Sequence, residues 1–231
     1  MARPLSVSEK AQEMEAFRQT LPLECRHKTE SYDMLKHCAV KTFTMGGEPI
    51  SPRIIEDLLI WVSDRKDQIT SINLIGSQRS NKYSTDSDAL QVSRGDKAQD
   101  VFDIEYIKEK VGRKHEADPF ISYQVHGVTD NGIYVISTLD GGGGGSSVFP
   151  TLLLVTFEED MGFDVDIVKN KILPQKRLML KKLFQINLID RSVFDVKING
   201  NKLDISILEW PNQKIRHEMS LDLATLLEKS A

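Results

Sequence analysis

Two Asn-Gly turns, each between β-rich segments, limit the possible folds of this chain more than any other sequence feature. The first turn is Asp-Asn-Gly at residues 130–132, and the second is Asn-Gly-Asn at residues 199–201. Asn-Gly supplies the positive φ angles of tight turns between antiparallel strands. The sequence therefore predicts two β-hairpins, which pair residues 120–128 with 133–139 and residues 193–198 with 203–208.

Four further segments have the residue pattern of strands. These segments are residues 69–75, 148–157, 163–167 and 183–189. Residues 148–157 are so rich in apolar side chains that we expect this strand to be covered on both faces. Residues 76–100 are polar, and we expect a long loop or irregular region there.

The N-terminal portion, residues 1–68, is predicted to be helical. Helices are expected before Pro22, over residues 30–43 and over residues 52–64, where Ser51 can cap the helix and Pro52 suits its first position. The third helix has an apolar face made by Ile55, Leu58, Leu59 and Val62. Shorter helices are predicted over residues 104–111 and, at the C-terminal end, over residues 219–229.

These segments predict a single α+β domain over residues 1–231. Its sheet portion, residues 69–210, is expected to be a mainly antiparallel sheet of hairpins, with the N-terminal helices and one C-terminal helix packed on it. The composition agrees, since 40% of the residues are hydrophobic and 28% are charged, close to the values of globular domains.

The charge of −4 is unevenly distributed along the chain. Residues 119–168 contain seven acidic side chains and no Lys or Arg, which makes an acidic patch. A basic segment follows directly, with Lys169, Lys171, Lys176, Arg177, Lys181 and Lys182. We expect the two segments to neutralise each other, so nucleic acid is an unlikely partner, and no membrane partner is predicted.

Cys25 and Cys38 are the two cysteines of the chain. Two cysteines in a chain of this length, without an apolar signal core near the N-terminus, predict a cytoplasmic protein with reduced thiols. His27 and His37 lie beside them, but the Cys-x-His and His-Cys spacings do not match those of zinc fingers or ribbons. We therefore expect no bound metal and no cofactor.

Two loops are candidate binding segments. The first contains the five glycines 141–145, which have no strand–loop–helix context for phosphate binding and are expected to be a mobile connector between adjacent strands. If this loop instead binds a ligand, its candidate residues are Gly141, Gly143, Gly145, Ser146 and Ser147. The second loop follows the strand at residues 69–75 and offers Gln78, Arg79 and Asn81.

Asp195 and Lys197 have the Asp-x-Lys spacing found on one strand of many metal-dependent nucleases. A further upstream acid, for which Asp164, Asp166 and Asp190 are the candidates, would help to hold the metal. Because Phe194, Val196 and Ile198 form the apolar face of this strand, we expect Asp195 and Lys197 to point into solvent instead.

The sequence therefore favours a non-enzymatic binding or interaction module, for example of the immunity or regulatory type, that recognises another protein or a small ligand. The alternative is a metal-dependent hydrolase or nuclease that uses Asp195 and Lys197. Whether the chain forms oligomers is left open by the sequence.

Overall fold

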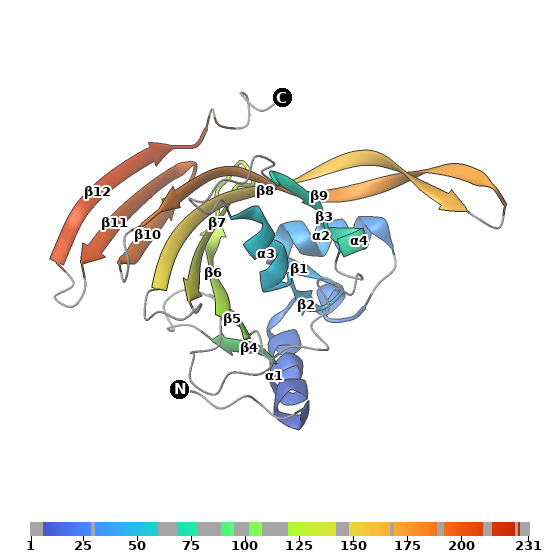
Figure 1. The fold of residues 1–231 in the computed structure, drawn as a ribbon, viewed down its shortest axis with the longest axis horizontal. Helices are drawn as coiled ribbons and strands as arrows, with labels where there is room; N and C mark the ends of the chain where they lie inside the picture. The colour runs from blue at the N-terminus through green and yellow to red at the C-terminus, as the bar shows by residue number, and fades with distance from the viewer. Residues whose placement is uncertain are drawn as a thin grey trace.

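The structure, a computed structural model, describes residues 7–28, 31–59, 69–77, 89–94, 102–107, 120–141, 148–166, 169–188, 192–209, 214–224 and 226. Its helices are α1 (Val7–Thr20), the short 3₁₀ helix η1 (Leu23–Cys25), α2 (Tyr32–Thr42), α3 (Pro52–Leu58) and α4 (Leu74–Ser77). Figure 1 shows these helices gathered on one side of a strongly curved sheet.

Antiparallel strands make up most of the rest of the described chain. The large sheet has seven strands in the order β3-β9-β8-β7-β6-β5-β4, a second sheet has the order β10-β11-β12, and β1 pairs with β2. The strands are β1 (Thr44–Met45), β2 (Glu48–Pro49), β3 (Ser71–Asn73), β4 (Ala89–Arg94), β5 (Phe102–Ile107), β6 (Phe120–Val128), β7 (Tyr134–Gly141), β8 (Val148–Asp166), β9 (Lys171–Asn187), β10 (Val193–Asn199), β11 (Lys202–Glu209) and β12 (Lys214–Asp222). The predicted α+β class with a mainly antiparallel sheet is confirmed.

Two hydrophobic layers lie on opposite faces of the large sheet. On one face, side chains of α2, α3 and the β1–β2 hairpin pack against alternate residues of the strands, among them Tyr134, Ile136, Leu153 and Val155. On the other face, the three-stranded sheet packs against the intervening residues Val135, Leu152 and Leu154, together with Ile133 just before β7. The central residues of β7 and β8, 134–136 and 152–155, are therefore covered on both faces, as the apolar run at residues 148–157 predicts.

An aromatic cluster attaches the helices to the large sheet. Phe43, which ends α2 in the left-handed conformation, packs its ring 4.9 Å from that of Tyr134 and 6.1 Å from that of Tyr123. The Tyr134 hydroxyl donates to the carbonyl of Val40, and the Tyr123 hydroxyl to that of Ile50, both at 2.6 Å. These bonds satisfy the buried polar ends of the two tyrosines and hold α2 and the segment before α3 in position.

The two predicted Asn-Gly hairpins are confirmed, and their turns contact each other. The amide of Asn131 donates to Oδ1 of Asn201 at 2.9 Å, and that of Asp130 donates to the carbonyl of Gly200 at 3.3 Å. The side-chain amide of Asn131 also donates to the carbonyl of Leu223, just after β12, at 2.8 Å. These bonds join the three-stranded sheet to the turn between β6 and β7 of the large one.

Several predicted boundaries are wrong because long-range pairing overrides local sequence preference. The strands predicted at 148–157 and 163–167 are one strand, β8, because residues 156–166 pair along their whole length with β9. Strand β9 likewise continues through Pro174, upstream of the predicted strand at 183–189. Residues 104–107 lie in β5 instead of a helix, and β4 lies within the predicted loop 76–100.

The helical predictions hold in part. Helices α1, α2 and α3 match the N-terminal predictions, but α3 ends at Leu58 because Leu59 has an extended backbone, so the predicted continuation of this helix through Leu59 is wrong. Residues 60–68 lie outside the description. The strand predicted at 69–75 is limited to β3, and α4 begins at Leu74. Residues 219–222 belong to β12, where they pair with β11, so this part of the predicted terminal helix 219–229 is wrong.

A substitution at Leu59, which directly follows α3, tests whether the apolar face predicted for this helix belongs to the core. Its side chain is 5% exposed and lies in the layer between the helices and the large sheet. Leu59→Ala is expected to lower the free energy of unfolding by about 2–5 kcal/mol through lost burial and the cavity left behind. Val40→Ala on α2, where the side chain is 43% exposed, is the control and should cost less than about 0.5 kcal/mol. Urea unfolding measures both, and similar small losses would show that this face is not core.

Candidate functional site

The glycine-rich candidate loop connects neighbouring strands. Gly141 ends β7 and pairs with Val148, the first residue of the antiparallel strand β8. The predicted adjacency of the strands is therefore confirmed. The remaining loop candidates, Gly143, Gly145, Ser146 and Ser147, lie outside the described residues, as do Gln78, Arg79 and Asn81 of the second loop.

Asp195 and Lys197 lie on the outward face of the three-stranded sheet. Both side chains are exposed, whereas Val196 between them is 5% exposed and packs into the inner layer. Their predicted orientation toward solvent is thus confirmed. Asp166, in contrast, belongs to the large sheet and lies near the free end of β8, at the opposite end of the molecule from β10 (Figure 1). The structure does not bring Asp166 next to Asp195 and Lys197.

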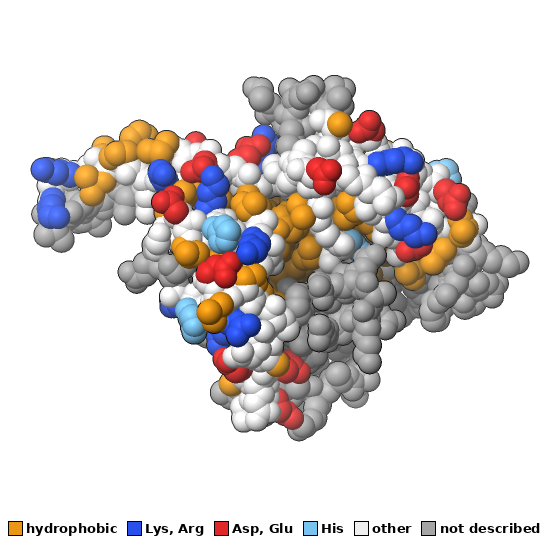
Figure 2. Space-filling view, turned by 180° about the vertical axis from the view of Figure 1, so that it is seen from behind, with side chains coloured by type: hydrophobic (Ala, Val, Ile, Leu, Met, Phe, Trp, Pro, Cys, Tyr) orange, Lys and Arg blue, Asp and Glu red, His pale blue; other side chains and the backbone are white. Residues whose placement is uncertain are grey.

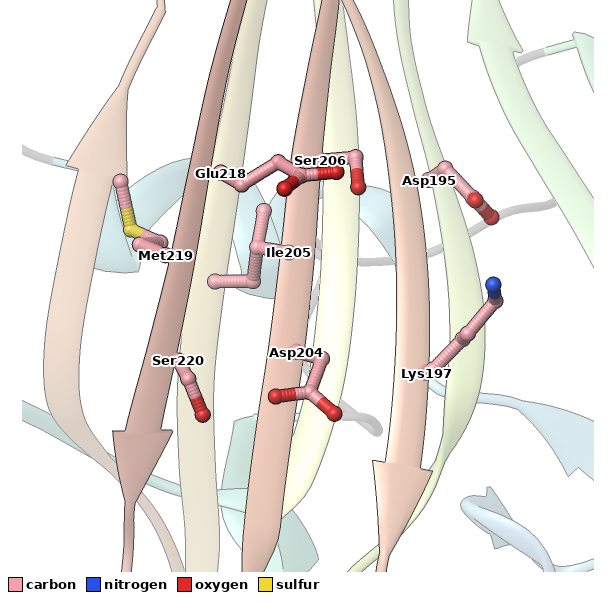
Figure 3. A pocket seen from close by; sticks show the side chains of 8 residues that line it. All are labelled: Asp195, Lys197, Asp204, Ile205, Ser206, Glu218, Met219 and Ser220. Atoms are coloured by element: carbon pink, nitrogen blue, oxygen red, sulfur yellow. The ribbon is translucent and has the colours of Figure 1, made fainter. Parts of the chain in front are cut away.

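Cross-strand neighbours surround Asp195 and Lys197 in a shallow depression of about 420 Å³ (Figure 3). Asp195 is opposite Ser206, and Lys197 is opposite Asp204, whose own neighbour on β12 is Ser220. The hydrogen bond from Ser220 and the charges of Lys202 and Lys197 lower the pKa of Asp204. Among the described residues, no three ligand atoms of the His, Cys, Asp or Glu type converge here as they would around a metal ion.

His126 makes a hydrogen bond that resembles a base–nucleophile pair. It is the extra residue of a β-bulge between β6 and β7, which turns its Nε2 to 2.8 Å from the hydroxyl of Ser137. Burial lowers the pKa of His126 to about 4, although the negative charge of Asp195 acts in the opposite direction. Because a general base works best with a pKa near the ambient pH, this histidine is poorly matched to base catalysis at neutral pH.

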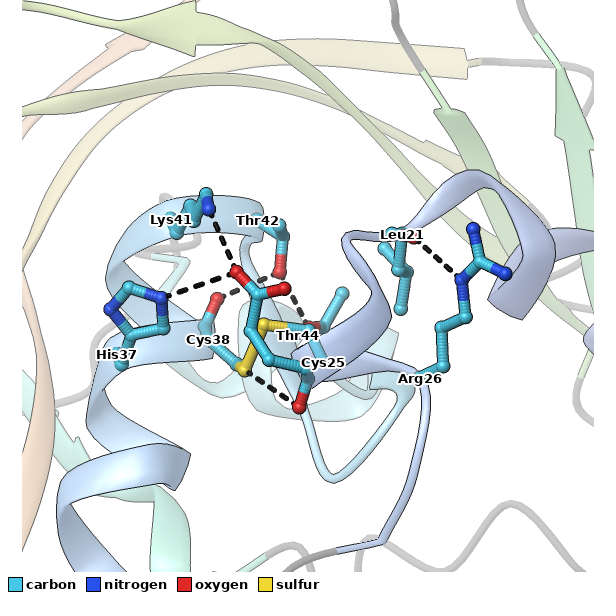
Figure 4. A network of polar contacts seen from close by, with 9 residues as sticks. Leu21, Cys25, Arg26, His37, Cys38, Lys41, Thr42 and Thr44 are labelled. Carbon is cyan, nitrogen blue, oxygen red and sulfur yellow. Dashed lines mark hydrogen bonds and ion pairs between the residues drawn. A yellow bond between two sulfur atoms is a disulfide. The ribbon is translucent and has the colours of Figure 1, made fainter.

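The N-terminal helices meet at a disulfide that the sequence did not predict. Cys25 and Cys38 are bonded to each other, so the expectation of two reduced thiols is wrong for this structure (Figure 4). The reason is geometric, because η1 turns the chain back after α1 and places Cys25 against the middle of α2, with the two Cα atoms 5.5 Å apart. Both cysteines are buried with Phe17 and Leu21 of the α1 segment.

A charged cluster covers this disulfide on its solvent side. The Glu24 carboxylate accepts a hydrogen bond from Lys41 at 2.9 Å and lies 3.7 Å from Nε2 of His37 (Figure 4). The hydrogen bond from Lys41 is the main cause that lowers the pKa of Glu24 to about 2. Glu24 was absent from the sequence-based candidates, because an isolated glutamate carries no signal of its spatial neighbours.

A two-stranded arm projects from the body of the molecule (Figure 1). We use this name for residues 159–166 of β8 and 171–178 of β9, which pair with each other beyond the last β7–β8 pair, Tyr134 with Val155. At its root, Glu158 forms an ion pair with Lys181 at 2.9 Å, and Glu159 forms one with Lys36 of α2. Glu158 and Lys181 thus confirm that the acidic and basic segments neutralise each other there.

One face of the arm is apolar and exposed. Directly opposite residues of antiparallel strands project from the same face, and Phe163 is opposite Pro174 while Met161 is opposite Lys176. Met161, Phe163 and Ile172 are 59%, 70% and 69% exposed. We call Met161, Phe163, Ile172 and Pro174 the apolar stripe. Hydrophobic side chains are visible along the projecting arm in Figure 2.

The burial of His126 predicts a pH-dependent stability. Between pH 6.5 and 4 the unfolded state binds a proton that the folded state does not, so stability falls as the pH falls through this window. From pH 7.5 to 4.5 the loss is about 2–3 kcal/mol. His126→Gln, which keeps a hydrogen-bonding group near Ser137, should remove most of this loss in urea unfolding. His217→Gln on the exposed part of β12 is the control, and an equal effect of both variants would contradict the prediction.

The connector role of the glycine loop predicts tolerance to shortening. Replacing residues 142–147 with Asn-Gly leaves the Gly141–Val148 pair to be closed by a hairpin turn. Because closure of a short loop costs little entropy, the free energy of unfolding should change by less than about 1 kcal/mol. Circular dichroism during urea unfolding measures this change, and a much larger loss would show that the loop contributes contacts of its own.

Comparison of the chain with models of protein families, with curated proteins and with solved structures found no match. Within the described residues, no helix has the length and apolar composition needed to span a membrane. The arm and the polar clusters described above are the candidate sites. Of these, the arm stands out because it combines two features. One of its faces is apolar, and beyond Val155 one edge of β8 pairs with no other described strand.

Proposed function

We propose that the protein is a non-enzymatic binding module that holds an extended segment of another protein against the β8–β9 arm. The observation that carries this proposal is the apolar stripe, whose three largest side chains are each more than half exposed on a projecting ribbon. A two-stranded ribbon in water has few contacts to stabilise it, and exposed apolar patches typically mark interaction sites. A partner that covers the stripe would stabilise the arm and bury these side chains.

The position of α2 supports a partner on this face. Tyr32 and Lys36 of α2 lie over the root of the arm, where the Tyr32 hydroxyl donates to Glu159 at 3.1 Å and the ammonium of Lys176 lies 5.1 Å from the Tyr32 ring. The apolar stripe begins where this cover ends. A bound segment would therefore continue the layer that α2 provides over the body.

The opposite face of the arm carries charged side chains. A side chain at Gly162 would place its Cβ 1.7 Å from Nε of Arg177, so the guanidinium of Arg177 already covers this glycine. Asp160 is directly opposite Arg177 and adds a second charged group to this face. The asymmetry between the two faces supports a partner that recognises the apolar stripe alone.

The edge of β8 supports an extended conformation of the partner. From Thr156 to Asp166, β8 pairs on one side with β9, and no other described strand pairs with its second side. The backbone groups of such an edge can hydrogen-bond to an added strand, while alternate side chains of that strand reach the apolar stripe. The expected ligand is thus a peptide segment with apolar residues at every second position.

Selection of a displayed library of random peptides on the immobilised protein tests the proposal. We expect enriched peptides with alternating apolar residues, and their synthetic forms should bind Phe163→Ser/Ile172→Ser at least about tenfold more weakly in fluorescence anisotropy, because two buried apolar contacts are lost. Both side chains are exposed, so this double variant should keep its free energy of unfolding within about 0.5 kcal/mol.

The matched control is Leu173→Ser, which removes a side chain that is 46% exposed on the other face of the same strand. It should keep its affinity within about twofold. The proposal is contradicted if no peptide is enriched or if the stripe and control variants bind equally. It is also contradicted if the stripe instead mediates dimerisation in analytical ultracentrifugation, or binding to anionic lipid vesicles.

A further inference from the structure

Four side chains of the types that bind zinc meet at the disulfide between η1 and α2. Glu24, Cys25 and His37 each place a ligand atom within 4.8 Å of the others. The sulfur of Cys38 is outside this group of three, but it is bonded to that of Cys25 and therefore lies directly beside the group. The sequence analysis considered His27 as a possible zinc ligand together with the cysteines and His37. Among the described residues, the structure places Glu24 in this group and not His27.

One pair of ligand atoms, from Glu24 and His37, already has the spacing found in a tetrahedral zinc site. Zinc binds thiolate sulfur at about 2.3 Å and imidazole nitrogen or carboxylate oxygen at about 2.0–2.2 Å, which places ligand atoms about 3.3–3.8 Å apart. The Glu24 oxygen and the His37 nitrogen are already 3.7 Å apart. In the oxidised protein the sulfurs cannot act as thiolate ligands, because they are bonded to each other.

The frame that holds these residues does not consist of the disulfide alone. The Arg26 guanidinium donates to the carbonyl of Leu21 at 2.8 Å and to Gln19 at 3.0 Å, which keeps η1 folded back on α1. Arg18 of α1 pairs with Glu48 of β2 at 3.2 Å. Leu35 and Ala39 bury α2 in the main core. We therefore expect the four candidate ligands to stay close together when the sulfur–sulfur bond is broken.

We propose that reduction of the Cys25–Cys38 disulfide creates a zinc site formed by the two cysteine sulfurs, His37 and Glu24. A dithiol reductant gives two electrons and two protons to the disulfide and is itself oxidised to a disulfide. Zinc then replaces the two thiol protons, which are released to solvent, and each sulfur donates an electron pair to the metal. Rotation about the side-chain bonds of the cysteines separates the sulfurs to the distance that two ligands of one ion require.

Lys41 competes with the metal in this arrangement. Its ammonium donates to the Glu24 oxygen at 2.9 Å and has to move when that oxygen binds zinc. A positive charge at this position also repels the ion. Lys41→Ala is therefore expected to raise the zinc affinity of the reduced protein, which a purely structural role of these residues would not explain.

The test compares oxidised and reduced full-length protein loaded with zinc. A phosphine reduces the disulfide without competing as a thiol ligand, and thiol labelling followed by mass spectrometry verifies the reduction. After gel filtration, elemental analysis should find about one zinc per reduced chain and far less in the oxidised chain. Cobalt substituted for zinc should show thiolate charge transfer and the visible bands of a tetrahedral ion.

Variants that keep both cysteines separate ligation from folding. Glu24→Gln and His37→Ala should each weaken zinc binding to the reduced chain by at least about tenfold, while His27→Ala, the matched control, should not. Circular dichroism of the oxidised variants checks that they fold. The proposal is overturned if the disulfide resists reduction in the folded protein, if reduced protein binds no zinc, if both redox forms bind it equally, or if His27→Ala weakens binding as much as His37→Ala.

Discussion

The pairing of β7 with β8 at the centre of the large sheet supports both hydrophobic layers of the molecule. Successive residues of β8, from Leu152 to Val155, are almost fully buried and point alternately to the helices and to the three-stranded sheet. Each fully buried side chain of this kind contributes about 1.5–3 kcal/mol of hydrophobic free energy. A polar residue at any of these positions would expose or disrupt one layer, so the arrangement of the helices and of the second sheet depends on this pair.

Polar contacts then determine how the outer elements attach to this centre. The hydroxyls of Tyr123 and Tyr134 reach the backbone of the segments next to α3 and α2, and the turn at Asn131 bonds to the second hairpin turn and to the carbonyl of Leu223. Hydrophobic burial alone does not select one orientation of packed layers, whereas these directed bonds do. The same attachment of α2 leaves the outer part of the arm uncovered and brings His37 to the disulfide.

The candidate sites differ in how far the sequence predicted them. The outward orientation of Asp195 and Lys197 follows from strand alternation, which is a local property, and the structure agrees. The arm was not predicted, because Glu158 to Asp160 and Pro174 interrupt the local strand pattern and are accommodated only when β8 and β9 pair with each other. The contact of Glu24 with Cys25 and His37 depends on the chain reversal at η1, which no spacing rule describes.

The sequence by itself determined the two Asn-Gly hairpins, the helical start of the chain and the double burial of residues 148–157. Each of these is encoded within a few neighbouring residues, by turn geometry, capping or the run of apolar side chains. Tertiary structure decided the length of β8 and β9, the strand at residues 214–222 and the meeting of Cys25 with Cys38. These features arise from contacts between segments distant in sequence, where pairing and burial outweigh the weaker preferences of the local chain.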